Sequence, residues 1–174
     1  MEGRSVTKPF IMFRLKRYLL IALVAALPVA GLSQEIKKMK ITDLEKVIKE
    51  SSTPLIVNFW ATYCIPCIEE MPHFLRLADK YKKDSVRLLL VSLDLQDAYP
   101  AQIEAFVKKR RIHAPMAWLD ESDADYFCPK VDSTWSGAIP ATLFVNNDNN
   151  YRRFIEEQLS EERLEKEIMA ILGK

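Results

Sequence analysis

The sequence predicts an α/β fold, a three-layer α/β/α sandwich in which helices cover both faces of a central mixed sheet. Through most of the 174 residues, apolar runs with the length of buried strands alternate with segments of helical periodicity. The composition, 49% hydrophobic and 28% charged, is that of an ordinary globular protein. Four glycines, nine prolines and the lack of any biased tract exclude collagen-like, disordered and repeat-array proteins.

The first 33 residues have the pattern of an export signal. Arg14, Lys16 and Arg17 precede an apolar run over 18–30, which small residues follow. The run is shorter than the roughly 20 residues that a membrane-spanning helix needs. We therefore predict a signal peptide over 1–33 and an exported, periplasmic protein. An uncleaved N-terminal anchor and a true start at Met12 remain alternatives.

The net charge of the chain indicates which classes of partner it can bind. Without the five basic residues and one acidic residue of 1–33, the net charge changes from +1 to −3. A mildly acidic protein is unsuited to nucleic acid, so no such partner is expected. Because disulfides persist outside the cytoplasm, thiol chemistry there must be driven by a partner protein.

The folded domain is expected over 42–174, after a short linker at 34–41. A capping-box pattern at 42–45 opens the first helix, whose apolar residues fall on one face. This helix ends before Pro54. The nearly continuous apolar run that follows, 55–60, is typical of a central strand.

A longer helix is expected over about 64–82, with its apolar residues on one side. The leucine- and valine-rich segment 86–93 predicts a second buried strand. Pro100 suits the first turn of the next helix. That helix ends in a basic cluster at 108–111, which complements the negative end of the helix dipole.

The last third of the chain predicts three strands and a helix. A short strand is expected at 116–119, followed by a polar stretch over 120–136 that breaks the alternation. Segments 141–146 and 151–155 flank four Asn and Asp residues, which tolerate left-handed conformations, so they predict a hairpin. Ser160 caps the final amphipathic helix.

Cys64 and Cys67 form a Cys-x-x-Cys pair where the strand 55–60 turns into a helix. Residues three apart share a helical face, so the two sulfurs can close a disulfide ring. The helix N-terminus favours the thiolate, which predicts an exposed, reactive Cys64 and a shielded, resolving Cys67. Pro66 fits the first helical turn, where its missing N–H would have no partner.

Two other functions of this cysteine pair have less support from the sequence. A zinc site needs two further ligands, and neither His73 nor Cys128 lies at ligand spacing, so no metal is expected. A purely structural disulfide would close so short a loop that it could stabilise little. Dithiol redox chemistry explains the pair better.

The residues around this pair resemble a known family. Segment 59–67, with the Glu-Met-Pro at 70–72, resembles the extracytoplasmic TlpA/ResA-like branch of the thioredoxin family. Segment 137–144 resembles the second signature of that family, in which the proline is cis and faces the dithiol. The resemblance covers 55–144 and implies the thioredoxin fold.

The resemblance implies a thiol:disulfide oxidoreductase in which Cys64 attacks a partner disulfide and Cys67 resolves the mixed disulfide. It implies a disulfide-containing protein substrate and a membrane electron donor or acceptor thiol protein as second partner. We expect no cofactor and a monomer, although the sequence does not indicate the oligomeric state. The resemblance also implies that backbone groups beside the cis proline pair with an extended substrate segment. The expected substrate contacts are Trp60, Tyr63, Ile65, Pro66, Ile139 and Pro140.

The sequence departs from the family pattern at two positions, Asn58 and Tyr63, and matches it at Glu70. Asn58 stands where cytoplasmic thioredoxins carry a buried aspartate. Tyr63 replaces the tryptophan more usual before the first cysteine, and it can still shield the sulfur. Glu70 resembles the proton-handling acid of the ResA-like branch, which would make it a catalytic group beside Cys67. A solvated position on the helix is the alternative for Glu70.

The sequence is compatible with more than one function of the Cys64–Cys67 pair. The protein could reduce disulfides, as in cytochrome c maturation or envelope repair, or it could install them. A redox-silent or copper-binding module is a further alternative, although the chain offers no clear histidine for copper. A peroxidase is excluded because the Pro, Thr and Cys pattern of peroxiredoxins is missing before Cys64. Cys128 is either a buried free thiol or a member of a secondary redox or intermolecular disulfide. The insertion at 120–136, which contains Trp135, could instead shape a partner-binding surface.

Overall fold

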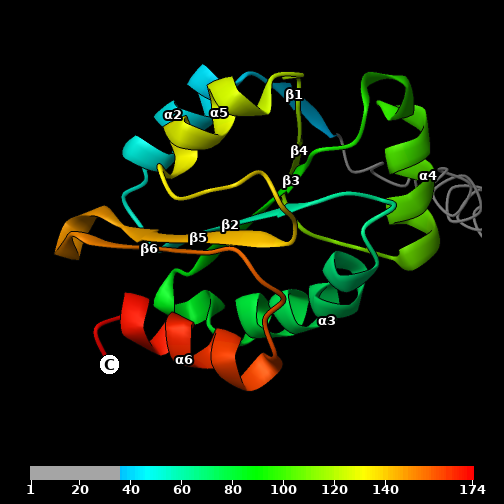
Figure 1. The fold of residues 1–174 in the computed structure, drawn as a ribbon. Coiled ribbons are helices and arrows are strands. Elements are labelled where there is room, and N and C mark those ends of the chain that lie inside the picture. Colours follow the sequence, from blue (N-terminus) through cyan, green and yellow to red (C-terminus); the bar gives the residue numbers. More distant parts are fainter. Residues whose placement is uncertain (1–35) are drawn as a thin grey trace, which may run out of the picture. The chain divides into compact units, whose positions relative to one another are not determined.

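The computed structural model describes residues 36–174, which form one six-stranded sheet with helices on both faces (Figure 1). The strands are β1 (Lys37–Met39), β2 (Leu55–Trp60), β3 (Arg87–Ser92), β4 (Met116–Leu119), β5 (Ala141–Asn146) and β6 (Tyr151–Ile155). The helices are α2 (Ile41–Lys49), α3 (Ile65–Lys80), α4 (Ala101–Arg110), α5 (Ala124–Val131) and α6 (Glu161–Ile171). The predicted α/β three-layer sandwich is confirmed.

The sheet has the order β1-β4-β3-β2-β5-β6. The four strands from β1 to β2 run parallel, whereas β5 and β6 are antiparallel to their neighbours. In β2 every residue is buried. Its side chains alternate, with Ile56 and Trp60 in one core cluster and Val57 and Phe59 in the other. This two-sided burial explains the continuous apolar run in the sequence.

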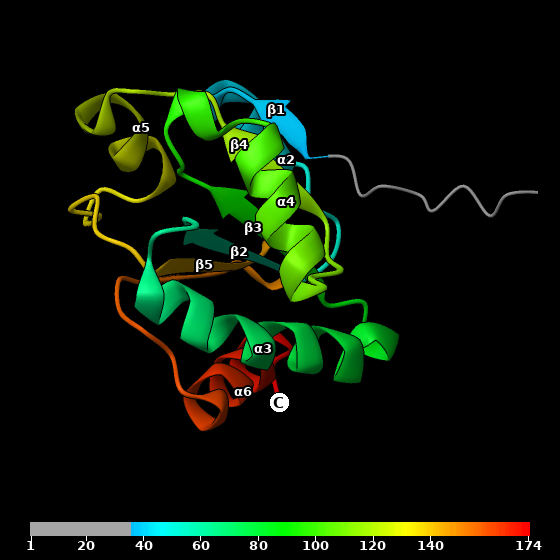
Figure 2. The same cartoon turned by 90° about the vertical axis from the view of Figure 1, so that its right-hand side faces the viewer.

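The two faces of the sheet have separate cores. Helices α3, α4 and α6 cover one face, and α2 and α5 cover the other. Figure 1 shows α2 and α5 on one side and α3 and α6 on the opposite side. Figure 2 shows α4 in front of the β3–β4 part of the sheet, next to α3. Because β2 is a central strand, the start of α3 lies at the C-terminal edge of the parallel strands, near the middle of the sheet.

The structure contains two elements that the sequence-based prediction missed. The segment 34–41, predicted as a linker, includes β1, which pairs in parallel with β4. The polar stretch 120–136 includes α5, whose inner side buries Phe127, Cys128 and Val131. A three-residue strand and an eight-residue helix are too short to show a clear period, so tertiary pairing and packing decide them.

The boundaries of the other helices and strands lie close to the predicted ones. Helix α2 begins at Ile41, one residue before the predicted cap, because Asp43 accepts a hydrogen bond from the backbone N–H of Lys40 at 3.1 Å. Ser160 caps α6 as predicted, accepting from the N–H of Arg163 at 3.3 Å. The predicted strand at 116–119 and the hairpin strands at 141–146 and 151–155 are confirmed.

Trp135 belongs to the core. It is 5% exposed and packs against the rings of Phe59, Phe127 and Phe154, with ring centroids 4.5–5.7 Å apart. Its indole N–H donates to the backbone oxygen of Ala138 at 2.9 Å. The Trp135 side chain therefore anchors the loop before β5 to the core and does not itself lie on the surface.

Cys128 is free and buried on α5, which confirms the prediction of a buried thiol. Burial raises its pKa to about 11, so the thiol is protonated at neutral pH. The predicted signal peptide or anchor over 1–33 lies outside the described residues. Over 36–174, no helix is both long and apolar enough to cross a membrane.

Candidate active site

The two cysteines lie where β2 leads into α3, and they form a disulfide. Cys64 is the N-cap residue of α3, and its Sγ accepts a hydrogen bond from the backbone N–H of Cys67 at 3.3 Å. Unpaired N–H groups and the helix dipole make this end of α3 favourable for negative charge. The arrangement therefore stabilises a thiolate on Cys64 once the disulfide is reduced.

The burial of the pair differs from the prediction in one respect. Cys67 is fully buried, as predicted, but Cys64 is only 7% exposed in the disulfide form. The prediction of an exposed Cys64 is therefore wrong for this state. The exposed side chains are its neighbours, Tyr63 at 65% and Ile65 at 68%. Pro66 lies half-buried in the first turn of α3.

The loop before β5 brings the second predicted motif to the same place. The Ile139–Pro140 peptide bond is cis, which confirms the prediction from the resemblance. Pro140 is buried, and Ile139 is half-buried. Ile139 and Tyr63 line one groove of about 510 Å³. The fold therefore brings together two segments that are more than 70 residues apart in the sequence.

Trp60 differs from the other predicted substrate contacts. Its side chain is fully buried at the end of β2 and packs against Phe106 of α4, with ring centroids 5.6 Å apart. It does not lie on the surface with Tyr63 and Ile65. The structure agrees with packing near the dithiol and not with direct contact to a partner protein.

Glu70 is fully buried on α3, one turn after Cys67. Its Oε1 accepts a hydrogen bond from Asn58 Nδ2 at 2.9 Å, and its Oε2 accepts one from the backbone N–H of Leu159 at 2.7 Å. Asn58 Nδ2 also reaches Thr142 Oγ1 at 3.1 Å. The alternative of a solvated helix position is therefore wrong, because β2 and the loop before α6 enclose this carboxyl.

Burial changes the acidity of this group. Desolvation raises the pKa of Glu70 to about 7, and the hydrogen bonds from Leu159 and Asn58 oppose the shift only in part. Glu70 can therefore gain or lose a proton near neutral pH. A carboxyl with this property beside a dithiol is a candidate for proton transfer.

Asp94, which is not among the predicted site residues, organises the loop before Cys64. Asp94 is 4% exposed, and both of its carboxylate oxygens accept from the backbone N–H of Thr62 at 3.1 Å. The hydroxyls of Thr62 and Ser92 also donate to this carboxylate, at 2.5 and 2.7 Å. An aspartate directly after the buried strand 86–93 was the only sequence signal for this role.

Replacing Asp94 by asparagine should lower the free energy of unfolding by about 1–3 kcal/mol. The asparagine amide has an NH₂ group in place of one carboxylate oxygen. A buried group that donates to that oxygen in the unmodified protein therefore loses its acceptor. Urea denaturation of the oxidised protein measures the change. Asp97→Asn is the matched control because Asp97 is exposed, and it should change the stability little. Equal stabilities of the two variants would rule out a structural role for the Asp94 carboxylate.

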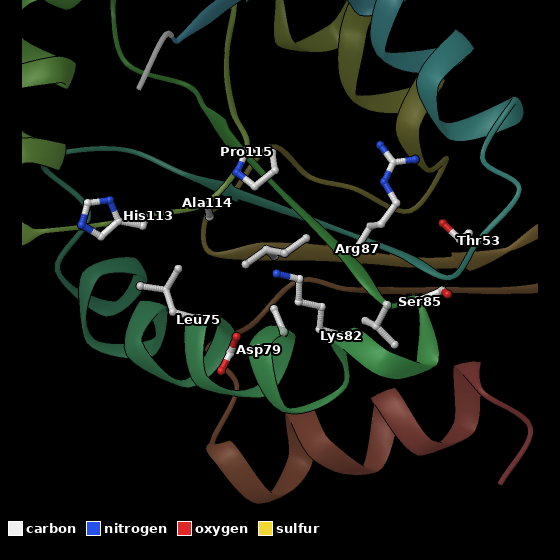
Figure 3. Close-up of a pocket in the computed structure, with 12 residues that line it drawn as sticks. Thr53, Leu75, Asp79, Lys82, Ser85, Arg87, His113, Ala114 and Pro115 are labelled. Carbon is white, nitrogen blue, oxygen red and sulfur yellow. The ribbon is translucent and has the colours of Figure 1, made fainter. Parts of the chain in front are cut away.

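A second pocket, of about 500 Å³, lies away from the dithiol (Figure 3). Leu75 and Asp79 of α3 border it on one side, and Arg87 and Pro115 border it near the starts of β3 and β4. Because β2, β3 and β4 are parallel, this pocket is at the opposite end of the strands from Cys64. None of the predicted site residues lines it.

Over 36–174, no group of three or more His, Cys, Asp or Glu side chains is placed to hold a metal ion. His73 instead contacts Arg76 at 2.8 Å and Glu161 at 3.4 Å on the surface of α3 and α6.

Known proteins are similar to this chain in sequence and in fold. The thiol-disulfide oxidoreductase ResA of Bacillus cereus is 29% identical over 130 residues, which make up 74% of this chain and 66% of that protein. The sporulation thiol-disulfide oxidoreductase A of Bacillus subtilis is 28% identical over 106 residues, 56% of this chain and 64% of that protein. The chain thus spans just under two thirds of the length of these relatives.

A thioredoxin-related protein from Neisseria meningitidis serogroup B has a similar crystal structure. The TM-score is 0.60 at 27% identity, and the match covers 71% of this chain and 88% of that chain. The family model described as the AhpC/TSA family matches residues 24–153, well over half of the chain. The chain therefore belongs to the AhpC/TSA family and has the thioredoxin fold.

Proposed function

We propose that this protein is an exported thiol:disulfide oxidoreductase that exchanges the Cys64–Cys67 dithiol and disulfide with protein partners. The observation that carries the proposal is the disulfide at the N-terminus of α3, where Cys64 accepts a backbone N–H. The relatives named thiol-disulfide oxidoreductases support the same chemistry.

The exchange proceeds in two steps when the protein acts as a reductant. The Cys64 thiolate attacks one sulfur of the partner disulfide, and the other partner sulfur leaves as a thiolate. The Cys67 thiolate then attacks Cys64 Sγ in the mixed disulfide and releases the second partner thiol. Two electrons pass to the partner, and a second thiol protein must reduce the Cys64–Cys67 disulfide again.

Glu70 has a place in the second step. Cys67 is fully buried and must lose a proton before it can attack. Glu70 is one helical turn away, and its pKa of about 7 lets it accept a proton at neutral pH. Protonated Glu70 can also donate a hydrogen bond to Asn58. The Asn58 Oδ1 atom is buried without a partner, and rotation of the Asn58 amide would turn this oxygen toward Glu70.

The substrate surface is formed by the side chains around the dithiol. Tyr63 and Ile65 are exposed on either side of Cys64, and Pro66 and the Ile139–Pro140 segment lie close to them in the fold. Trp60 supports this surface from below and does not contact the partner. The protein would act as a monomer without a cofactor.

Export is proposed from the sequence alone. We assign 1–33 as a signal peptide or an anchor, and the domain after it includes β1 in addition to 42–174. The protein would then work in the periplasm with a membrane thiol protein as electron donor, and cytochrome c maturation or envelope disulfide reduction would be its task.

The reduction potential of the Cys64–Cys67 pair tests the direction of electron flow. Equilibration in thiol/disulfide buffers, followed by tryptophan fluorescence, gives this value. We expect a potential near thioredoxin's, about −270 mV, as for a dithiol that donates electrons. A potential toward about −120 mV would indicate an oxidant that installs disulfides. The lack of a reversible two-electron transition would contradict both and favour a redox-silent module.

A further inference from the structure

Exposed apolar side chains line the groove beside the dithiol or adjoin its lining residues in the sequence. Within 36–174, the exposed large hydrophobic side chains are Tyr63, Ile65, Leu95 and Tyr126. Tyr63 and Leu95 line the groove. Ile65 follows Cys64, and Tyr126 precedes a groove residue on α5. Exposed apolar side chains concentrated in one place mark an interaction surface.

The floor of the groove is apolar and held in place. Leu93, Trp118 and Phe127 contribute side chains to it. The indole N–H of Trp118 donates to the backbone oxygen of Asp94 at 2.7 Å, and the ring stacks on Tyr99 at 4.4 Å between centroids. A floor fixed in this way loses little conformational entropy when a partner covers it.

The rim of the groove is acidic. Six carboxylates line or flank it: Asp94, Asp97, Asp120, Glu121, Asp123 and Asp125. The nearby cations are Lys38 and Lys40, and both pair with Asp120, at 3.1 and 2.9 Å. Over 36–174 no cation pairs with any of the other five carboxylates. The local net charge is therefore about −4.

The opposite end of the parallel strands carries a cluster of basic side chains. Helix α4 ends there with Lys108, Lys109, Arg110 and Arg111, and β3 begins there with Arg87. A positively charged partner is thus attracted to the dithiol end and repelled by the other end.

We propose that this groove binds an extended polypeptide segment that carries basic side chains next to an apolar side chain. The proposal rests on the proposed function, because the segment is the one that flanks the disulfide attacked by Cys64. Its apolar side chain covers Leu93 and Phe127, and its basic side chains lie near Glu121 and Asp125. Complementary charge speeds the encounter and selects this partner over an acidic one.

Two synthetic peptide disulfides provide the test. Each is a disulfide-linked dimer of a peptide with one cysteine and one leucine, flanked either by lysines or by glutamates. The rate constant for reduction of each dimer by the reduced protein is divided by its rate constant with dithiothreitol. This division removes the effect of the flanking charges on the reactivity of the disulfide itself. Reduction of insulin is measured in parallel.

We expect the normalised rate constant to be at least about tenfold higher for the lysine peptide at low salt. Salt at about 0.5 M should reduce most of this difference, because it screens exposed charges. The triple variant Asp97→Asn, Glu121→Gln and Asp125→Asn should show a preference of less than about threefold. The glutamine keeps the oxygen that accepts from the backbone N–H of Ile41.

The matched control removes three carboxylates at the other end of the molecule. Glu50→Gln, Asp79→Asn and Asp148→Asn change the net charge equally, and the control should keep the full preference for the lysine peptide. Equal normalised rates for both peptides in the unmodified protein would overturn the proposal while leaving the oxidoreductase function intact. An unchanged preference in the first triple variant would overturn the assignment to this groove. Failure to reduce either peptide or insulin would overturn the proposed function and this inference together.

Discussion

Replacement of Cys64 by serine should slow disulfide exchange with insulin by at least about a thousandfold, because a hydroxyl cannot replace the attacking thiolate. Cys64 is positioned as the N-cap of α3, where its sulfur accepts the N–H of Cys67. The rate of insulin precipitation in the presence of a thiol reductant measures the loss.

Cys67→Ser gives the complementary result. The first attack is still possible, but the mixed disulfide is not resolved, so covalent adducts with the substrate should accumulate. Non-reducing gel electrophoresis and mass spectrometry detect them. The matched control is Cys128→Ala, which removes the one other cysteine of the chain and should leave the rate within about twofold. Full turnover by Cys67→Ser would refute its role as the resolving thiol.

Replacement of Glu70 by glutamine should change how the stability of the protein depends on pH. The folded protein raises the pKa of Glu70 from 4.5 to about 7, so between these values the folded state binds more protons than the unfolded state. The stability of the unmodified protein should therefore fall as pH rises from about 4.5 through 7. Between pH 4.5 and a pH above 7, the free energy of unfolding of the unmodified protein should fall by about 3 kcal/mol more than that of Glu70→Gln.

Urea denaturation at pH 4.5 and pH 8 measures this difference. Glutamine retains an acceptor for the N–H of Leu159 and can donate to a reversed Asn58 amide, so the variant is expected to fold. Glu69→Gln is the matched control, because Glu69 is exposed on the same helix and should leave the pH dependence unchanged. A pH dependence that is the same for Glu70→Gln and the unmodified protein would show that Glu70 keeps its ordinary acidity.

The same variant separates a structural role from proton transfer. The rate of resolution by Cys67 should show an inflection near pH 7 in the unmodified protein, and Glu70→Gln should remove it. A purely structural carboxyl would change the stability without changing this profile. Stopped-flow tryptophan fluorescence over the pH range follows the step.

Local patterns in the sequence were sufficient for the main elements. The apolar run of β2, the cap at Ser160 and the hairpin around 147–150 depend on neighbours within a few residues, and the structure agrees with each. The position of Cys64 and Cys67 at a helix start is local in the same sense, because a strand, a turn and a helix follow one another directly.

Features that depend on distant segments were predicted less well. Strand β1 exists because it pairs with β4, and α5 exists because its inner side packs on the sheet. The role of Asp94 needs Thr62, which lies 32 residues away in the sequence. No periodicity within a short window contains this information.

The sequence by itself determined the layered α/β fold and the dithiol at the start of α3, and the resemblance to the thioredoxin family added the cis proline that accompanies the dithiol. Only the tertiary structure decided that Glu70 is buried, that Cys64 is covered in the disulfide form and that Trp60 and Trp135 lie in the core. The physical reason is that capping and periodicity act over a few residues, whereas burial depends on which distant segments pack together. The raised pKa of Glu70 is the clearest case. Its carboxyl group is enclosed by β2 on one side and by the loop that precedes α6 on the other.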